Sequence, residues 1–328
     1  MVYKKVKKIE ENLSVIGIGC WNFGGDWDGV TDQSVKQVVR AAIEEGINFF
    51  DVAPVYGFYH AEAVLGKIMK QEGIRNKIFL ASKCGLRWGK DRVTRNDLSR
   101  KSILEEIDAS LSRLQTDHID LYQLHWPDHT TPIEETAETL KEIQKAGKIR
   151  YVGLSNFSQS EVEKFESYIE VHAQQGLYNM LERNTSQYHN IPLEYKTELE
   201  VFPHVKREGQ AFLPYSPLCQ GLLTGVFHRQ GNFSKDDIRN QNPKFSLDPK
   251  NDIYFEITES LKKFSEKIEK PLYEVAINWL RSKEQITSII AGVKSVDELS
   301  KNLKSLEWKL DQEMLNEIEK IIDPVRVL

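Results

Sequence analysis

Four side chains with acid, base or phenolic chemistry stand at the ends of three apolar segments of this 328-residue chain. Asp51 and Tyr56 fall in "FFDVAPVYG", Lys83 in "LASKCG" and His125 in "LYQLHWPD". A phenol has a pKa near ~10, so it is a poor acid or base at neutral pH unless a nearby ammonium group favours the phenolate. Lys83 could supply that charge, Asp51 could hold Lys83, and His125 could orient a carbonyl oxygen. The set therefore suits proton transfer at a carbonyl oxygen while hydride moves at the carbon.

Each of these residues also has an ordinary explanation when it is taken alone. Tyr56 could pack or form a turn, and Lys83 could be solvated at a strand end. Asp51 could cap a turn, and His125 could be a hydrogen-bonded core histidine. The chemical interpretation therefore depends on a fold that brings the four side chains together.

Short apolar segments alternate with amphipathic segments along most of the chain, which is typical of strands and helices in a parallel sheet covered on both faces. The expected strands are 15–19, 47–52, 77–82, 118–125, 149–155, 171–175, 210–216 and 286–292. The expected helices are 32–45, with Asp32 as its cap, 61–70, 98–114, 133–146, 159–167, 193–208, 273–281 and 296–303, with a further C-terminal helix at 311–322. Eight strand and helix pairs predict a (β/α)8 TIM barrel, whose reactive groups gather where the strands end.

Two features lie outside this alternation. The segments "VYKKVKK" and "LSVIGIG" flank Glu11 and Asn12, which predicts an N-terminal β-hairpin that turns there. Residues 218–251 are rich in Gly, Asn, Asp, Lys and Pro, which predicts a long loop after strand seven. We expect one barrel domain over residues 1–328, with this loop at its mouth.

Composition excludes several classes of protein. The chain is 40% hydrophobic with a formal net charge of -5, so a basic nucleic-acid surface is not expected. No run approaches the roughly 20 apolar residues that span a membrane, and no apolar segment follows "MVYKKVKKIEE" as in a secretory signal. Three cysteines without paired spacing favour a reducing compartment, and we expect a cytoplasmic protein that is a monomer or a weak homo-oligomer.

The quoted motifs resemble those of the aldo-keto reductases, and the resemblance extends from "LSVIGIGCW" to "KSVDELSKNL". "DVAPVYG", "ASKCG", "LHWPD" and "GLSNF" are similar to the segments that carry this family's Asp, Tyr, Lys and His tetrad and its fifth strand end. The resemblance implies a (β/α)8 barrel with a nicotinamide cofactor and a small-molecule carbonyl or sugar substrate. It is strongest for a bacterial branch of general reductases and sugar or inositol dehydrogenases with a long loop after strand seven.

A Rossmann site is not expected at "GIGCWNFGG", because the glycine spacing fails and no helix opens there. The resemblance instead implies a cofactor extended across the barrel mouth. Ser155, Asn156 and Gln175 would bind the nicotinamide carboxamide, and Tyr215 would stack on the ring. The other residues expected to contact the cofactor are Gly19, Cys20, Trp21, Asp51, Ser216, Pro217, Leu218, Gly221 and Gly292.

The resemblance also places Lys294 and Ser295 at a ribose 2′-phosphate and Asn302 at the adenine, which favours NADP(H). A Lys and Ser pair before a helix suits a phosphate on general grounds, although Ser295 could simply cap that helix. Glu298 departs from the Gln of close relatives, and its carboxylate would repel a 2′-phosphate. We therefore expect a relaxed preference, with real use of NAD(H).

The predicted substrate pocket consists of Tyr56, His125 and the aromatic residues Trp21, Trp88 and Trp126, although these tryptophans could equally be packing. Asn22, Asp26, Asp28 and Asp128 are nearby in the sequence and could bind hydroxyl groups or be solvated. Cys20, Cys84 and Cys219 adjoin the site motifs; a metal site is not expected, burial is, and a reactive Cys84 is a weaker hypothesis.

The expected activity is reversible reduction of aldehydes or ketones with NADP(H), Tyr56 being the acid. One alternative is a sugar or inositol dehydrogenase that works mainly in oxidation. Another, from a different class, is a nicotinamide-binding regulatory subunit, since the barrel also resembles channel β subunits. Because the hairpin begins almost at Met1, no long N-terminal extension is expected, which disfavours that second alternative.

Overall fold

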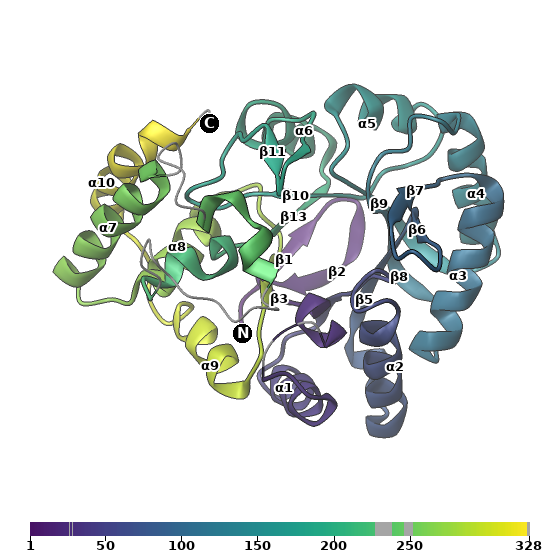
Figure 1. The fold of residues 1–328 in the computed structure, drawn as a ribbon, viewed down its shortest axis with the longest axis horizontal. Helices are drawn as coiled ribbons and strands as arrows, with labels where there is room; N and C mark the ends of the chain where they lie inside the picture. Colours follow the sequence, from purple (N-terminus) through teal and green to yellow (C-terminus); the bar gives the residue numbers. More distant parts are fainter. Residues whose placement is uncertain (26, 28, 227–237, 246–251, 327–328) are drawn as a thin grey trace.

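A barrel of eight parallel strands forms the centre of the computed structural model, which describes residues 1–25, 27, 29–226, 238–245 and 252–326 (Figure 1). The barrel strands are β3 (Ile16–Gly19), β4 (Phe49–Asp51), β5 (Phe79–Cys84), β8 (Ile119–Leu124), β9 (Ile149–Ser155), β10 (Ala173–Leu177), β13 (Ala211–Tyr215) and β14 (Ile289–Gly292). The pairing order is β13-β10-β9-β8-β5-β4-β3-β14, and a parallel bridge between Phe212 and Ile286 closes the ring. The predicted (β/α)8 barrel is confirmed.

The helices surround the strands (Figure 1). They are α1 (Asp32–Glu44), α2 (His60–Glu72), α3 (Arg100–Leu114), α4 (Ile133–Lys145), α5 (Gln159–Glu166), α6 (Phe202–Glu208), α7 (Asp252–Lys267), α8 (Leu272–Ser282), α9 (Val296–Lys304) and α10 (Gln312–Ile322). α7, α8 and α10 lie together on one side of the barrel (Figure 1). Among the described residues, no helix is both long enough and apolar enough to cross a membrane.

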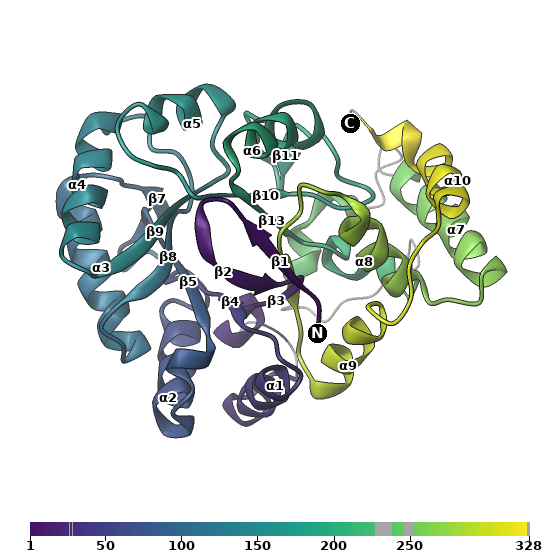
Figure 2. The same cartoon turned by 180° about the vertical axis from the view of Figure 1, so that it is seen from behind.

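An N-terminal hairpin of β1 (Tyr3–Val6) and β2 (Ile9–Ser14) covers the end of the barrel that faces the viewer in Figure 2. Ile9 and Leu13 are fully buried in a cluster with Phe49 and Phe79 from the barrel strands. The predicted turn at Glu11 and Asn12 is wrong, because the strand continues through these residues. The turn falls instead between β1 and β2, because Ile9 and Leu13 both bury against the barrel.

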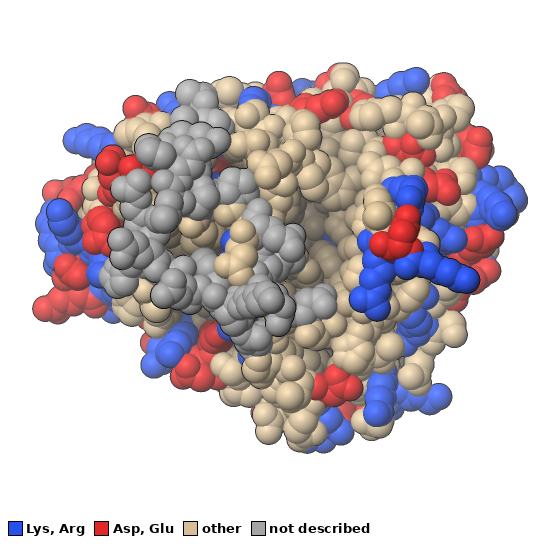
Figure 3. All heavy atoms as spheres, in the orientation of Figure 1, with Lys and Arg blue, Asp and Glu red and all other residues tan. Residues whose placement is uncertain are grey.

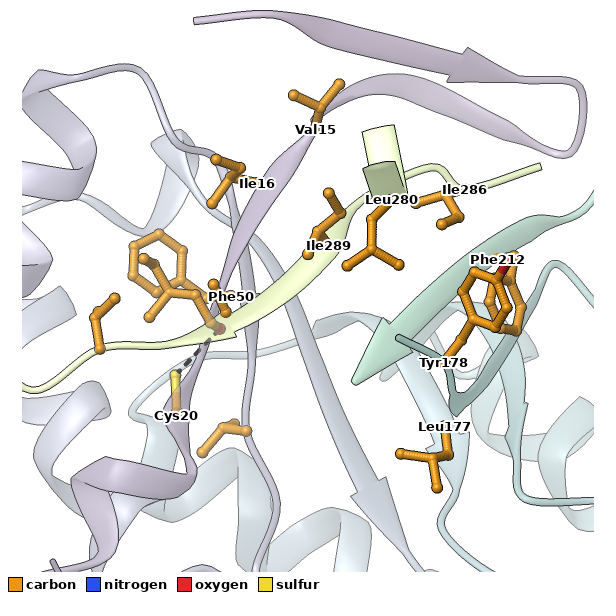
Figure 4. Close-up of a cluster of buried hydrophobic side chains, with 14 of the residues drawn as sticks. Val15, Ile16, Cys20, Phe50, Leu177, Tyr178, Phe212, Leu280, Ile286 and Ile289 are labelled. Atoms are coloured by element: carbon orange, nitrogen blue, oxygen red, sulfur yellow. Dashed lines mark hydrogen bonds between the residues drawn. The ribbon is translucent and has the colours of Figure 1, made fainter. Parts of the chain in front are cut away.

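A second and larger apolar cluster joins the outer side of the strands to the helices. Figure 4 shows part of it, where Ile289 of β14, the strand that pairs with β3, lies beside Leu280 of α8. The strands are buried on both faces, and consecutive apolar residues such as Phe49 and Phe50 are therefore fully inaccessible. This packing fixes the strand ends that carry the polar residues.

Several expected elements differ from the structure. Thr31, not Asp32, is the cap of α1, because its side chain accepts from Ser34 N. The helix expected at 193–208 starts only at Thr197, with a π-helical turn (Thr197–Val201) before α6. α7 was not expected at all. Two short hairpins also occur where loops were expected, and one of them consists of β6 (Leu86–Trp88) and β7 (Thr94–Asn96).

The segment expected as a long loop over 218–251 lies partly outside the described residues. Its described parts contain the short helices Cys219–Thr224, Ile238–Gln241 and Pro243–Phe245. The small hairpin of β11 (Gln187–Tyr188) and β12 (Ile191–Pro192) follows β10. Tyr188 in this hairpin packs edge-on against Tyr215 at 5.3 Å between ring centroids.

Candidate active site

Lys83 lies at the centre of a buried polar cluster at the mouth of the barrel. It comes from β5, next to β4, which ends with Asp51. Lys83 Nζ lies 2.6 Å from Asp51 Oδ2 and donates a hydrogen bond to Tyr56 Oη at 2.9 Å. The Lys83 side chain is fully buried, so these contacts replace its hydration. Burial alone would lower the pKa of Lys83, but Asp51 and Tyr56 outweigh it and raise that pKa, so the ammonium stays charged.

Two buried amides hold the other oxygen of Asp51. Gln123 Nε2 donates to Asp51 Oδ1 at 3.0 Å, and Gln175 Nε2 donates to the same oxygen at 2.9 Å. The Gln175 amide also donates to Gln123 Oε1 at 3.0 Å. Gln123 was not predicted, although a glutamine inside the apolar strand "LYQLH" is a signal that could have identified it. The carboxylate is therefore fixed by two amides on one oxygen and by an ammonium on the other.

A glycine contact holds the loop that carries Tyr56. Gly57 has a positive φ of 61°, and a Cβ on it would lie 1.9 Å from the carbonyl oxygen of Gly24. The loop after β4 therefore packs directly on the loop after β3, which only a glycine permits. Burial raises the pKa of Tyr56, while the charge of Lys83 and its hydrogen bond lower it in part. The phenol is consequently protonated at neutral pH.

His125 follows β8 and lies beside Tyr56, with 6.0 Å between ring centroids and an almost perpendicular arrangement. Burial, together with the charge of Lys83, holds the pKa of His125 well below its usual range, so the imidazole is neutral. Its Nδ1 is buried and has no hydrogen-bond partner among the described residues. A neutral ring can still donate one hydrogen bond to an oxygen in the mouth. The structure thus brings all four predicted chemical residues together.

The mouth is a hollow near the centre of the face shown in Figure 3, and most of the described residues around it are neither acidic nor basic. Trp21 lies 6.3 Å from the Tyr56 ring and packs edge-on against Trp27 at 5.6 Å. Trp88 instead packs against Phe58 and Tyr59. Trp126, which follows His125, is partly buried against the core. Trp21 is therefore the predicted tryptophan with a direct contact to Tyr56.

Ser155, Asn156, Gln175 and Tyr215 lie together, and the side chain of Asn156 is fully hydrogen-bonded in the structure. Its Nδ2 donates to His125 O and Ser155 Oγ, and its Oδ1 accepts from the hydroxyls of Tyr195 and Tyr215. These four bonds use its whole hydrogen-bonding capacity. Asn156 therefore braces the ring of Tyr215 rather than offering a free amide.

A nicotinamide carboxamide fits the hydrogen-bonding groups that remain without a partner in this network of described residues. The Ser155 hydroxyl accepts from Asn156 and still has a proton to donate, whereas Gln175 Oε1 has no partner among the described residues. One donor and one acceptor complement the carbonyl and amino groups of a carboxamide. Tyr215 adds an aromatic face beside them.

The segment after Tyr215 has an unusual backbone. Ser216, Cys219, Gln220 and Gly221 all have positive φ, between 48° and 98°. Left-handed conformations are strained for residues other than glycine, and such strain is common at binding sites. Pro217 and Leu218 lie within this stretch. The segment predicted to contact the cofactor is thus a folded turn at the mouth.

At the expected adenosine end, Ser295 caps α9 by accepting from Glu298 N at 3.2 Å. Glu298 Oε2 in turn accepts from Lys294 N at 2.8 Å. The carboxylate therefore already occupies part of the helix N-terminus, where a phosphate would bind. Asn302 is buried on the same helix. Gly292 ends β14, and a Cβ there would lie 3.1 Å from Asn22 Oδ1, which places Asn22 against this strand end.

Asp128 already has several hydrogen-bond partners, and the three cysteines are buried. Asp128 accepts from Leu98 N and from Thr130 and Thr131, which lower its pKa to about 2, so it stabilises a turn. Asp26 and Asp28 lie outside the described residues. Cys20, Cys84 and Cys219 are free and buried, and burial raises the pKa of each thiol well above its usual value. Burial of Cys84 and the raised pKa of its thiol disfavour the hypothesis of a reactive thiolate at the mouth. Gly19 is also buried.

Comparisons with known proteins agree with this fold. The model of the aldo/keto reductase family matches residues 15–323. Aldo-keto reductase YhdN of Bacillus subtilis (strain 168) is 35% identical over 325 residues, covering 98% of this chain and 94% of the relative. NADH-specific methylglyoxal reductase of Escherichia coli (strain K12) is 29% identical over 91% of each chain. The structure of glycerol dehydrogenase AKR11B4 from Gluconobacter oxydans has a TM-score of 0.85 at 32% identity, with 98% of this chain and 95% of that chain covered.

The fold and the buried Asp, Tyr, Lys and His cluster define a barrel oxidoreductase that acts on small molecules. The chain belongs to the aldo/keto reductase family, whose members use nicotinamide cofactors. The family resemblance noted in the sequence is confirmed.

Proposed function

We propose that this protein reversibly reduces aldehydes or ketones to alcohols with NADP(H), and that it also uses NAD(H). The observation that carries the proposal is the position of Lys83 between Asp51 and Tyr56, 2.6 Å and 2.9 Å from their oxygens. A buried, charged ammonium beside a phenol prepares the phenol to give up its proton and stabilises the phenolate that results.

The side chains divide the work as follows. Tyr56 gives its proton to the carbonyl oxygen in reduction and takes it back in oxidation. Lys83 stabilises the phenolate, Asp51 holds Lys83, and neutral His125 orients the oxygen by a hydrogen bond. Ser155 and Gln175 bind the nicotinamide carboxamide beside Tyr215. When bound, the cofactor supplies or accepts the hydride at the carbonyl carbon.

Cofactor choice is proposed to be relaxed. Lys294 and Ser295 at the start of α9 support binding of a 2′-phosphate. The Glu298 carboxylate, which accepts a hydrogen bond from Lys294 N, would repel that phosphate. The name of the relative from Escherichia coli, an NADH-specific enzyme, supports real use of NAD(H). Neither cofactor is therefore expected to be excluded.

The substrate class is proposed to be small polar carbonyl compounds or the corresponding alcohols. The names of the relatives, methylglyoxal reductase and glycerol dehydrogenase, support small oxygenated substrates. The second of these names also supports the alternative that oxidation of a polyol or sugar is the main direction. Three free, buried cysteines support a reducing compartment such as the cytoplasm, and we propose a monomer or a weak homo-oligomer.

One experiment tests the proposal and separates the alternatives. A panel of aldehydes, ketones, sugars and polyols is assayed in both directions at the nicotinamide absorbance, with NADPH and NADH and with the oxidised forms. We expect turnover of carbonyls with both reduced cofactors. Oxidation that dominates at comparable concentrations would favour the dehydrogenase, and tight cofactor binding without turnover of any compound would favour a regulatory subunit.

A further inference from the structure

A buried ion pair joins two loops beside the turn that follows β13. Lys244 belongs to the short helix Pro243–Phe245, and Glu182 belongs to the loop after β10. Lys244 Nζ lies 2.5 Å from Glu182 Oε1. Lys244 is 8% exposed and Glu182 is 2% exposed. Lys244 Nζ also lies 5.5 Å from the centroid of the Tyr254 ring on α7. None of these residues belongs to the proton-transfer cluster, so the pair requires another explanation.

The second oxygen of Glu182 holds the turn itself. Glu182 Oε2 accepts from Asn179 Nδ2 at 2.7 Å and from Cys219 Sγ at 3.5 Å. Asn179 Nδ2 also donates to Ser216 O at 2.9 Å. Ser216 and Cys219 are two of the residues with positive φ. Glu182 therefore connects the strained turn on one side with Lys244 on the other.

A second contact runs parallel to the ion pair. Asn242 Nδ2 donates to Gln220 Oε1 at 2.6 Å, and the Gln220 amide contacts His189 Nε2 at 2.7 Å. Gln220 has a φ of 52° and lies in the same turn. Two residues of the 238–245 segment thus fix the turn residues Cys219 and Gln220, one through Glu182 and the other directly.

The 238–245 segment also touches the opposite side of the mouth. The guanidinium carbon of Arg239 lies 5.9 Å from the centroid of the Trp27 ring, and Trp27 packs on Trp21 beside Tyr56. The segment therefore extends from the turn after β13 to the loop after β3. A substitution of Lys244 would therefore alter contacts at the place where the cofactor is proposed to lie.

We propose that Glu182 and Lys244 are positioning residues, which hold the turn Ser216–Gly221 in its strained conformation so that it is ready before the cofactor binds. The inference rests on the proposed function, because it takes this turn as a cofactor contact. A preformed turn lowers the conformational cost of binding, so loss of the pair raises the Kd of the cofactor. The proton-transfer residues do not touch the pair, so kcat with saturating cofactor is unaffected.

The test is a fluorescence titration of full-length protein with NADPH and with NADH, together with steady-state kinetics. Glu182→Gln and Lys244→Met are each expected to raise Kd roughly tenfold, with kcat at saturating cofactor within about twofold. Lys244→Arg keeps the cation and should retain most of the affinity. The double variant should have a cofactor Kd no higher than that of the single variant that binds cofactor less tightly. Each single variant already breaks the pair and leaves the other partner buried and unpaired, so the second substitution removes no further contact between them.

Asp120→Asn is the matched control. Asp120 is 3% exposed and paired with Arg75 and Arg150, but it lies near the start of β8, at the opposite end of the barrel. The proposal is overturned if Glu182→Gln and Lys244→Met change Kd no more than this control, or if their effects multiply in the double variant. If these variants do not fold, Asn242→Ala decides in the same way, with a severalfold higher Kd expected. Failure of the unaltered protein to bind either cofactor would instead refute the proposed function.

Discussion

Lys83 Nζ donates to Tyr56 Oη at 2.9 Å, although Lys83 lies in β5 and Tyr56 lies in the loop after β4. The ammonium is fully buried, and its other strong contact is the Asp51 carboxylate. Tyr56 is the one member of this trio that is partly exposed.

Tyr56→Phe is expected to lower kcat by roughly 10²-fold to 10⁴-fold, because only the transferable proton is removed. Cofactor affinity should be nearly unchanged, since the ring remains. Stopped-flow or steady-state kinetics measure the first quantity and fluorescence titration the second. Equal losses of turnover and of cofactor binding would show that Tyr56 is structural instead.

Lys83→Met is expected to change the pH profile of alcohol oxidation, in which Tyr56 must be deprotonated. Burial raises the pKa of Tyr56 and Lys83 lowers it in part, so loss of the ammonium raises that pKa further. The rising limb of kcat/KM should therefore move to higher pH in the variant. A limb that stays in place, with only its height reduced, would contradict this role of Lys83.

Gln123→Leu is expected to lower kcat by about tenfold, since it removes a charge-directed hydrogen bond from Asp51. The matched control is Gln174→Leu. Gln174 is the neighbour of Gln175 in β10, points to the opposite face of that strand, and donates to Gln210 instead of Asp51. The control should affect stability and leave kcat within about twofold. Similar kcat values for both variants would show that the hydrogen bond from Gln123 to Asp51 does not contribute to catalysis.

Glu298→Gln is expected to raise the ratio of kcat/KM for NADPH to that for NADH by roughly tenfold, about 1.4 kcal/mol. The variant removes a negative charge near the 2′-phosphate but keeps an acceptor for Lys294 N. Asp297→Asn removes the same charge one residue away, where the carboxylate pairs with Lys301, and should have a smaller effect. A large preference of the unaltered protein for NADPH that Glu298→Gln leaves unchanged would refute the proposed relaxed preference.

Glu106→Gln is expected to stabilise the protein at pH 8 by up to about 3 kcal/mol. Burial raises the pKa of Glu106 from 4.5 to about 7 in the folded state, so its ionisation opposes folding. The unaltered protein should therefore lose stability as pH rises from about 4.5 through about 7, while the variant should lack this loss.

Urea unfolding at pH 5 and pH 8 measures this difference. Glu105→Gln is the control, because Glu105 is the exposed neighbour that pairs with Arg87. A gain from Glu106→Gln that is the same at both pH values would show that ionisation of Glu106 is not its cause.

The sequence by itself determined the barrel and the four chemical residues. Parallel strands of short apolar segments such as Ile149–Ser155 have one direction, so residues at their carboxyl ends meet at one mouth. Asp51, Lys83 and His125 could therefore be placed by their position in the alternation alone. The turn of the first hairpin could not, because the burial of Ile9 and Leu13 against the barrel decides it.

Only the tertiary structure decided which partners each side chain has. Gln123 and Gln175 reach Asp51 because the three residues lie on three different strands and all point into the barrel. Glu182 accepts a hydrogen bond from Cys219 in the turn after β13 and pairs with Lys244, which comes from a distant part of the chain. Such contacts depend on distances between elements and on the burial of each polar group, which local spacing along a sequence does not specify.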